Sequence, residues 1–112
     1  MARAYKILGQ TNPTANVLST LYTVPAGNSA IISSITVANL NEAANVGGAF
    51  RISANVSGVA VSNANYLAYS VNVPSRDTVT LKLGVTLNAG SIVSVNANSS
   101  LLAFSPFGTE VY

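Results

Sequence analysis

The side chains that could support acid–base or nucleophilic chemistry are few and widely spaced. The 112 residues include three carboxylates, Glu42, Asp77 and Glu110, and no His, Cys or Trp. A glycosidase needs two carboxylates facing each other across a cleft, and the sequence predicts that each of these three lies in a loop or tail. Without His or Cys, a serine paired with a lysine is the remaining nucleophilic arrangement, and Lys6 and Lys82 are predicted to be ordinary exposed residues. We therefore expect no enzyme activity, no metal site and no cofactor.

The chain is poor in charge for its hydrophobicity. Hydrophobic residues make up 49% of it and charged residues only 7%, whereas soluble proteins carry about 25% charged residues. Exposed strand edges with few charges pair readily with other chains. We therefore expect a homo-oligomer that acts by binding and assembly.

Charge and hydropathy patterns argue against two classes of partner. The net charge of +2 involves five cations spread along the chain, whereas nucleic-acid-binding proteins gather Lys and Arg on one face. No apolar run approaches the roughly 18 residues of a membrane-spanning helix. We expect no nucleic acid and no membrane among the partners.

Apolar residues alternate with Ser, Thr and Asn in several runs, as is typical of strands. In residues 31–37 the alternation puts Ile31, Ser33, Ile35 and Val37 on one face, and Ile32 and Ser34 on the other. The other predicted strands cover residues 5–8, 21–24, 50–56, 67–73, 79–85, 92–97 and 101–104. The last two are predicted to form a hairpin.

About eight short strands around one core predict an all-β fold, an antiparallel β-sandwich. A jelly roll is the favoured variant, and an immunoglobulin-like Greek key is the alternative, although the Cys and Trp residues of that core are missing. The strand order is not predicted. Residues 20–112 are expected to form the sandwich and residues 1–19 an N-terminal arm or edge strand. As an edge strand this segment packs on its own sheet; as an arm it adds to a neighbour's sheet.

The candidate assembly interface combines this first segment with the aromatic residues, because interfaces are enriched in aromatics. Tyr66 and Tyr69 are three positions apart, which predicts opposite faces of a strand and no paired aromatic platform for a sugar. The candidate interface residues are Arg3, Tyr5, Lys6, Ile7, Leu8, Tyr66, Tyr69, Phe107 and Tyr112.

Several segments together resemble small virion structural proteins of tailed bacteriophages. The segments are 4–10 (AYKILGQ), 21–27 (LYTVPAG), 30–39 (AIISSITVAN), 66–67 (YL), 78–81 (TVTL), 87–92 (LNAGSI) and 107–110 (FGTE). The similarity spans almost the whole chain and consists of strands and turns.

This resemblance implies a virion location, and a capsid decoration or cement protein is the favoured role. Such a protein binds the major capsid protein or other virion proteins and stabilises the shell, and a trimer is the favoured oligomer. The alternative is a neck, baseplate or tail-fibre component, including one that contacts a host receptor. A carbohydrate-binding domain is a third class, which requires a concave patch of exposed aromatics with polar loops.

Overall fold

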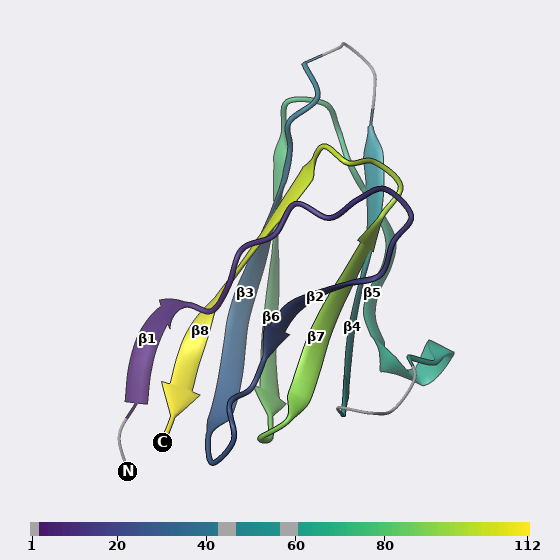
Figure 1. Ribbon diagram of the computed structural model, residues 1–112. Helices are drawn as coiled ribbons and strands as arrows, with labels where there is room; N and C mark the ends of the chain where they lie inside the picture. Colours follow the sequence, from purple (N-terminus) through teal and green to yellow (C-terminus); the bar gives the residue numbers. More distant parts are fainter. Residues whose placement is uncertain (1–2, 43–46, 57–60) are drawn as a thin grey trace.

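The computed structural model describes residues 3–42, 47–56 and 61–112, and these form a two-layered β-sandwich (Figure 1). A 3-10 turn, η1 (Asn63–Asn65), precedes the fifth strand. The strands are β1 (Arg3–Ile7), β2 (Ser19–Thr23), β3 (Ser29–Asn39), β4 (Gly48–Val56), β5 (Tyr66–Val73), β6 (Thr78–Leu87), β7 (Ser91–Ala97) and β8 (Leu102–Val111).

Each layer is an antiparallel sheet of four strands. The first sheet has the order β1-β8-β3-β6 and the second the order β2-β7-β4-β5. The predicted antiparallel β-sandwich of about eight strands is therefore confirmed. An immunoglobulin domain places its first two strands side by side, whereas here β1 and β2 belong to different sheets. The strand order therefore differs from that of the immunoglobulin alternative.

The core lies between the two sheets. The ring of Phe50 from the second sheet meets the ring of Phe104 from the first edge to face, with centroids 5.7 Å apart. Such a pair adds about 1 kcal/mol to the burial of its surface. The largest fully buried side chains around it are Ile32, Ile35, Ile52, Leu102, Val24, Val37, Val73, Val93, Val95 and Pro106.

The prediction that residues 92–97 and 101–104 form a hairpin is wrong. β7 pairs with β2 and β4, whereas β8 pairs with β1 and β3. The turn at Asn98, Ser99 and Ser100 therefore carries the chain from one sheet to the other. Neighbouring strands in sequence often pair, but local sequence does not distinguish a hairpin turn from a crossing between layers.

The prediction that Ile31 shares a face with Ile35 is also wrong. Ile32 is fully buried and Ile31 is exposed, yet Ile35 is fully buried. The register with β8 moves from Ile32↔Gly108 to Ser34↔Phe107, so one extra residue lies on β3. A β-bulge of this kind reverses the inward and outward sense of the residues on its two sides.

A similar irregularity lies in β5, where Leu67 and Tyr69 were expected on the same face as Val71 and Val73. Val73 is fully buried and Val71 packs on the core, but Leu67 and Tyr69 are exposed. The register with β4 shifts twice in this strand, and Ser70 has a positive φ of 55°. The alternation therefore reverses at Ser70.

Candidate assembly surface and the ion pair beneath it

Exposed apolar side chains gather on the outer face of the first sheet, next to its β1 edge. Paired residues in adjacent strands lie side by side on the same face. Tyr5 pairs with Thr109, which pairs with Ile31, and in the next row Ile7 pairs with Phe107. The exposed fractions are 76% for Tyr5, 50% for Ile7, 39% for Ile31 and 36% for Phe107. We call these four residues the apolar strip.

A shallow depression of about 430 Å³ lies beside three residues of the apolar strip, Tyr5, Ile7 and Phe107, and is also lined by Lys6, Ser33 and Gly108. Gly108 has a structural reason to be glycine, since a Cβ there would lie 2.1 Å from the carbonyl oxygen of Ile31. Its missing side chain lets β8 and β3 approach closely at the bulge. The strip therefore depends on a backbone contact that only glycine permits.

Glu110 lies on the opposite, inner side of β8 and is buried, at 6% exposure. The Nζ of Lys6, on β1, lies 2.6 Å from its Oε1. The hydroxyl of Tyr22, on β2 of the other sheet, donates a hydrogen bond of 2.5 Å to its Oε2. The Glu110 carboxylate thus links its own strand, β8, to β1 of the same sheet and to β2 of the other sheet. The expectation that Glu110 lies in a tail is wrong, because β8 continues to Val111.

These contacts change the pKa of the Glu110 carboxyl and of the Tyr22 hydroxyl. The hydrogen bond from Lys6, aided by the one from Tyr22, lowers the pKa of Glu110 and outweighs the opposing effect of burial. Burial raises the pKa of Tyr22, and its hydrogen bond to the Glu110 carboxylate raises it further. The cluster therefore holds an ionised glutamate beside a protonated tyrosine at neutral pH. With both carboxylate oxygens engaged, Glu110 is suited to fastening strands together.

The other two carboxylates lie in loops between strands, as predicted. Asp77 accepts a hydrogen bond of 2.8 Å from the backbone N–H of Thr78, just before β6. Within the described part of the chain, no three acidic, His or Cys side chains come close enough to hold a metal ion. The described residues also include no helix long and apolar enough to cross a membrane.

The nine predicted interface residues fall into separate groups. Tyr5, Ile7 and Phe107 meet on the apolar strip, Lys6 turns inward to Glu110, and Leu8 is in the hydrophobic core. Arg3 is exposed at the start of β1, and Tyr112 is 57% exposed just after β8.

Tyr66 and Tyr69 lie far from the strip in strand order, on β5 at one edge of the second sheet. Their rings meet edge to face with centroids 5.0 Å apart, and the guanidinium of Arg51 lies 4.1 Å from the centre of the Tyr69 ring. The prediction that these two tyrosines point to opposite faces of the strand is therefore wrong. The β5 irregularity removes the strict alternation on which it rested.

Sequence reasoning missed three residues of this region: Ile31, Tyr22 and Glu110. Ile31 was placed on the same face as Ile35 and Val37 because the bulge was not foreseen. Glu110 and Tyr22 are 88 positions apart, so no local pattern links them. The one available signal was Gly108 within a strand of large side chains, since an isolated glycine in a strand often marks a bulge.

No protein-family model matches this chain, and no curated protein matches it. Two crystal structures are similar, both of a pentameric capsid protein isolated from metagenomic phage sequences, one of them solved by iodide SAD phasing. Each is 15% identical with a TM-score of 0.32. The matches cover 96% of this chain but only 64% and 62% of those proteins, less than two thirds of their length. A likeness of this size does not assign the chain to a family.

Proposed function

We propose that the chain is a non-enzymatic structural protein of a bacteriophage virion, and specifically a capsid decoration protein that cements copies of the major capsid protein. The apolar strip is the observation that carries this proposal. Four large apolar side chains lie exposed together on one outer face of a chain with 7% charged residues. Contiguous exposed apolar surface marks protein interaction sites, and charge depletion with enriched aromatics is typical of interface cores.

The strand order supports the same role. The orders 1-8-3-6 and 2-7-4-5 support the proposal that this sandwich is a jelly roll, an architecture used by viral capsid proteins and lectins. Fold alone does not define function, so this support is secondary. The similarity of segments such as 4–10 and 30–39 to phage virion proteins adds the virion location.

The free edge of β1 provides a second contact. Among the described strands β1 pairs only with β8, so its other side presents backbone groups that no described strand pairs with. Residues 3–7 are tied to their own sandwich by this pairing and by the Lys6–Glu110 ion pair. We propose that segment 1–19 supplies an edge strand to the sandwich of residues 20–112. A strand of the neighbouring subunit then pairs with the free side of this edge strand. Residues 1 and 2 lie outside the described residues.

Assembly through this surface would use closed symmetry, and we propose a homotrimer that bridges neighbouring capsid subunits. Binding to the assembled shell and not to free subunits stabilises the shell by mass action. The alternative is a neck, baseplate or tail-fibre component, including one that contacts a host receptor. Copy number separates the two roles, because decoration requires many copies per particle and the alternatives only a few.

The first experiment is analytical ultracentrifugation of the chain at micromolar concentration, followed by a particle-binding assay. The double variant Tyr5→Ser/Ile7→Ser should dissociate the oligomer and lose particle binding. A control variant, Val56→Ser, removes an apolar side chain that is 61% exposed on the other sheet and should do neither. A wild-type chain that sediments only as a monomer, or a double variant that assembles normally, contradicts the proposal.

Point variants are better suited to this test than removal of residues 1–10. Such a truncation would leave the buried Glu110 carboxylate without Lys6 and remove Leu8 from the hydrophobic core. A loss of binding would then report misfolding as well as loss of contact. Quantifying the protein in purified particles separates decoration from the neck, baseplate and fibre roles.

A further inference from the structure

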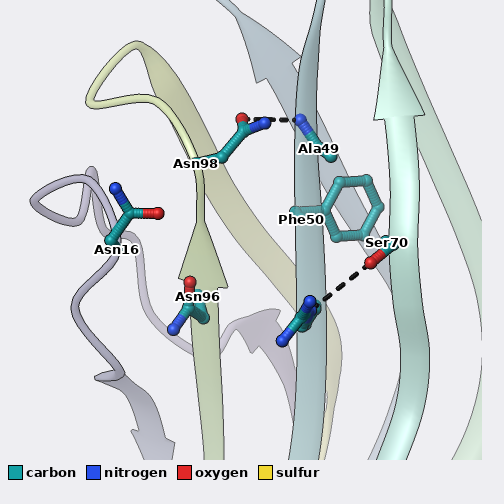
Figure 2. A pocket seen from close by; sticks show the side chains of 7 residues that line it. Asn16, Ala49, Phe50, Ser70, Asn96 and Asn98 are labelled. Carbon is teal, nitrogen blue, oxygen red and sulfur yellow. Dashed lines mark hydrogen bonds between the residues drawn. The ribbon is translucent and has the colours of Figure 1, made fainter.

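A polar pocket lies on the outer face of the second sheet, away from the apolar strip. It has a volume of about 300 Å³, which is at the lower end for small-molecule sites. Figure 2 shows the amide side chains of Asn16, Asn96 and Asn98 around it, with Ser70 on its far side. Arg51 also lines it, and we call it the amide pocket.

The floor and walls of the amide pocket come from different elements. Arg51 on β4 pairs with Asn96 on β7, so their side chains stand together on the outer face. Asn98 follows at the end of β7, where its Oδ1 accepts a hydrogen bond of 2.9 Å from the backbone N–H of Ala49. That bond holds the Asn98 amide in place (Figure 2).

Two walls are formed by residues with unusual backbone geometry. Asn16, in the segment before β2, has a φ of 61°, and Ser70, in β5, has a φ of 55°. The described residues contain one further non-glycine residue with positive φ, Arg76. The Asn16 N–H is held to the carbonyl of Ala97 by a hydrogen bond of 2.7 Å. Such conformations cost about 1–3 kcal/mol each and concentrate at ligand sites.

The polar groups of the amide pocket are largely unused within the described part of the chain. The side chains of Asn16 and Asn96 have no hydrogen-bond partner there, judged over residues 3–42, 47–56 and 61–112. Arg51 donates through Nε to the Ser70 hydroxyl at 3.4 Å and stacks on Tyr69. The ion pair between Lys6 and Glu110 is the only one among the described residues, so no carboxylate neutralises Arg51.

This set of groups defines the chemistry of a ligand. A primary amide offers both donors and an acceptor, which suits the paired hydroxyls of a sugar ring. An unpaired guanidinium suits a carboxylate, which it binds through two parallel hydrogen bonds. We propose that the amide pocket binds an acidic saccharide unit, a polyhydroxylated ring that carries a carboxylate.

A carboxylate from a partner protein fits this lining less well. An aspartate or glutamate side chain would engage Arg51 and leave the amides of Asn16 and Asn96 without partners as water is expelled. Unpaired buried polar groups cost about 1–3 kcal/mol each. A saccharide supplies hydroxyls for these amides and a carboxylate for Arg51 at the same time.

Saturation-transfer NMR on the full chain tests this proposal with trigalacturonate, sialyllactose and a hyaluronan tetrasaccharide. Lactose is the neutral control, and a short polyglutamate peptide is the acidic protein control. At least one acidic saccharide should bind, more tightly than lactose and than the peptide. The proposal is overturned if none of the three binds at millimolar concentration, or if the peptide binds as well as the saccharides.

Variants then locate the binding. Asn96→Asp keeps the size of the side chain but adds a negative charge beside Arg51, and should weaken acidic saccharide binding at least tenfold. Arg51→Gln should remove the preference over lactose. Lys82→Gln makes the same charge change on β6 of the other sheet and should leave binding unchanged. Circular dichroism verifies that each variant is folded. Unchanged binding by folded Asn96→Asp shows that the amide pocket is not the site.

These experiments do not depend on the proposed assembly role. The saccharide variants lie on the second sheet, and Tyr5 and Ile7 lie on the first. If Tyr5→Ser/Ile7→Ser abolishes assembly while saccharide binding persists, the two surfaces act separately. Failure of either proposal therefore leaves the other open to its own test.

Discussion

The two outer faces of the sandwich differ in chemistry although they cover the same core. The first sheet presents the apolar strip, with Tyr5 76% and Phe107 36% exposed, and the second presents the amide pocket around Arg51 and Asn96. Contact through the apolar strip is favourable because it removes apolar surface from water. Removing water from the amide pocket is favourable only if its amides and its guanidinium form hydrogen bonds with the ligand.

Both faces depend on a strand irregularity. An extra residue on β3 at Ser33 turns Ile31 outward, and the positive φ at Ser70 turns Tyr69 outward while Val71 stays on the core. Bulges commonly redirect side chains next to functional sites. A few backbone irregularities therefore decide which side chains each face presents to solvent.

The largest expected effect is on stability, at the bulge beneath the apolar strip. Gly108→Ala places a Cβ against the carbonyl of Ile31, and backbone clashes in a packed region cost about 3 kcal/mol. Gly27→Ala is the control, because Gly27 has a positive φ of 81° but open space around it. Placing an L-residue in this left-handed conformation should cost about 1 kcal/mol. Urea unfolding measures both. Equal losses would show that steric contact at Gly108 is unimportant.

The next largest expected effect is on the strength of assembly, and it should differ between variants on the two faces. Phe107→Ser should weaken assembly about 30-fold, as expected for an aromatic anchor worth about 2 kcal/mol. Tyr69→Ser removes an aromatic ring with 56% exposure from the other sheet and should leave assembly within twofold. Sedimentation equilibrium measures the two constants. If Tyr69→Ser is the more damaging, the assembly surface has been assigned to the wrong face.

A smaller effect concerns the ion pair behind the strip and its pH dependence. The pKa of Glu110 is lowered in the folded chain, so its contribution is complete above the unfolded value of about 4.3 and is lost as the pH falls below it. The free energy of unfolding of the wild type should exceed that of Glu110→Gln by about 1 kcal/mol at neutral pH, and this difference should shrink as the pH falls from the unfolded value through the lower folded pKa.

Denaturant titrations between about pH 7 and pH 3 test this expectation. Glu42→Gln, in the loop after β3, is the control for loss of a carboxylate elsewhere in the chain. A constant difference between wild type and Glu110→Gln across this range would show that the Glu110 carboxylate is not linked to folding.

The smallest effect is expected at the edge of the amide pocket. Arg51→Gln removes the guanidinium from the Tyr69 ring, and an exposed cation–π contact contributes about 0.5–1 kcal/mol. Thermal unfolding should show a small decrease in stability, with the change for Lys82→Gln smaller still. A loss as large as that of Gly108→Ala would mean that Arg51 supports the sheet and not mainly the pocket.

The sequence predicted the β-sandwich well because alternation and turns are local properties. Thr78–Leu87 alternates along its length, and the glycines after Ala26 and Ala89 both occupy turns with positive φ. The candidate surface was predicted only in part. Tyr5, Ile7 and Phe107 came together because β1 pairs with β8, which no local pattern could show.

The sequence by itself determined the fold class, the apolar core positions of most strands and the shortage of chemically active side chains. These follow from periodicity and composition, which are carried by residues close together in the chain. The tertiary structure decided the rest: the partner of each strand, the positions of the bulges at Ser33 and Ser70, and the meeting of Lys6, Tyr22 and Glu110. Those features depend on contacts between distant residues, and one shifted residue in a strand exchanges its two faces.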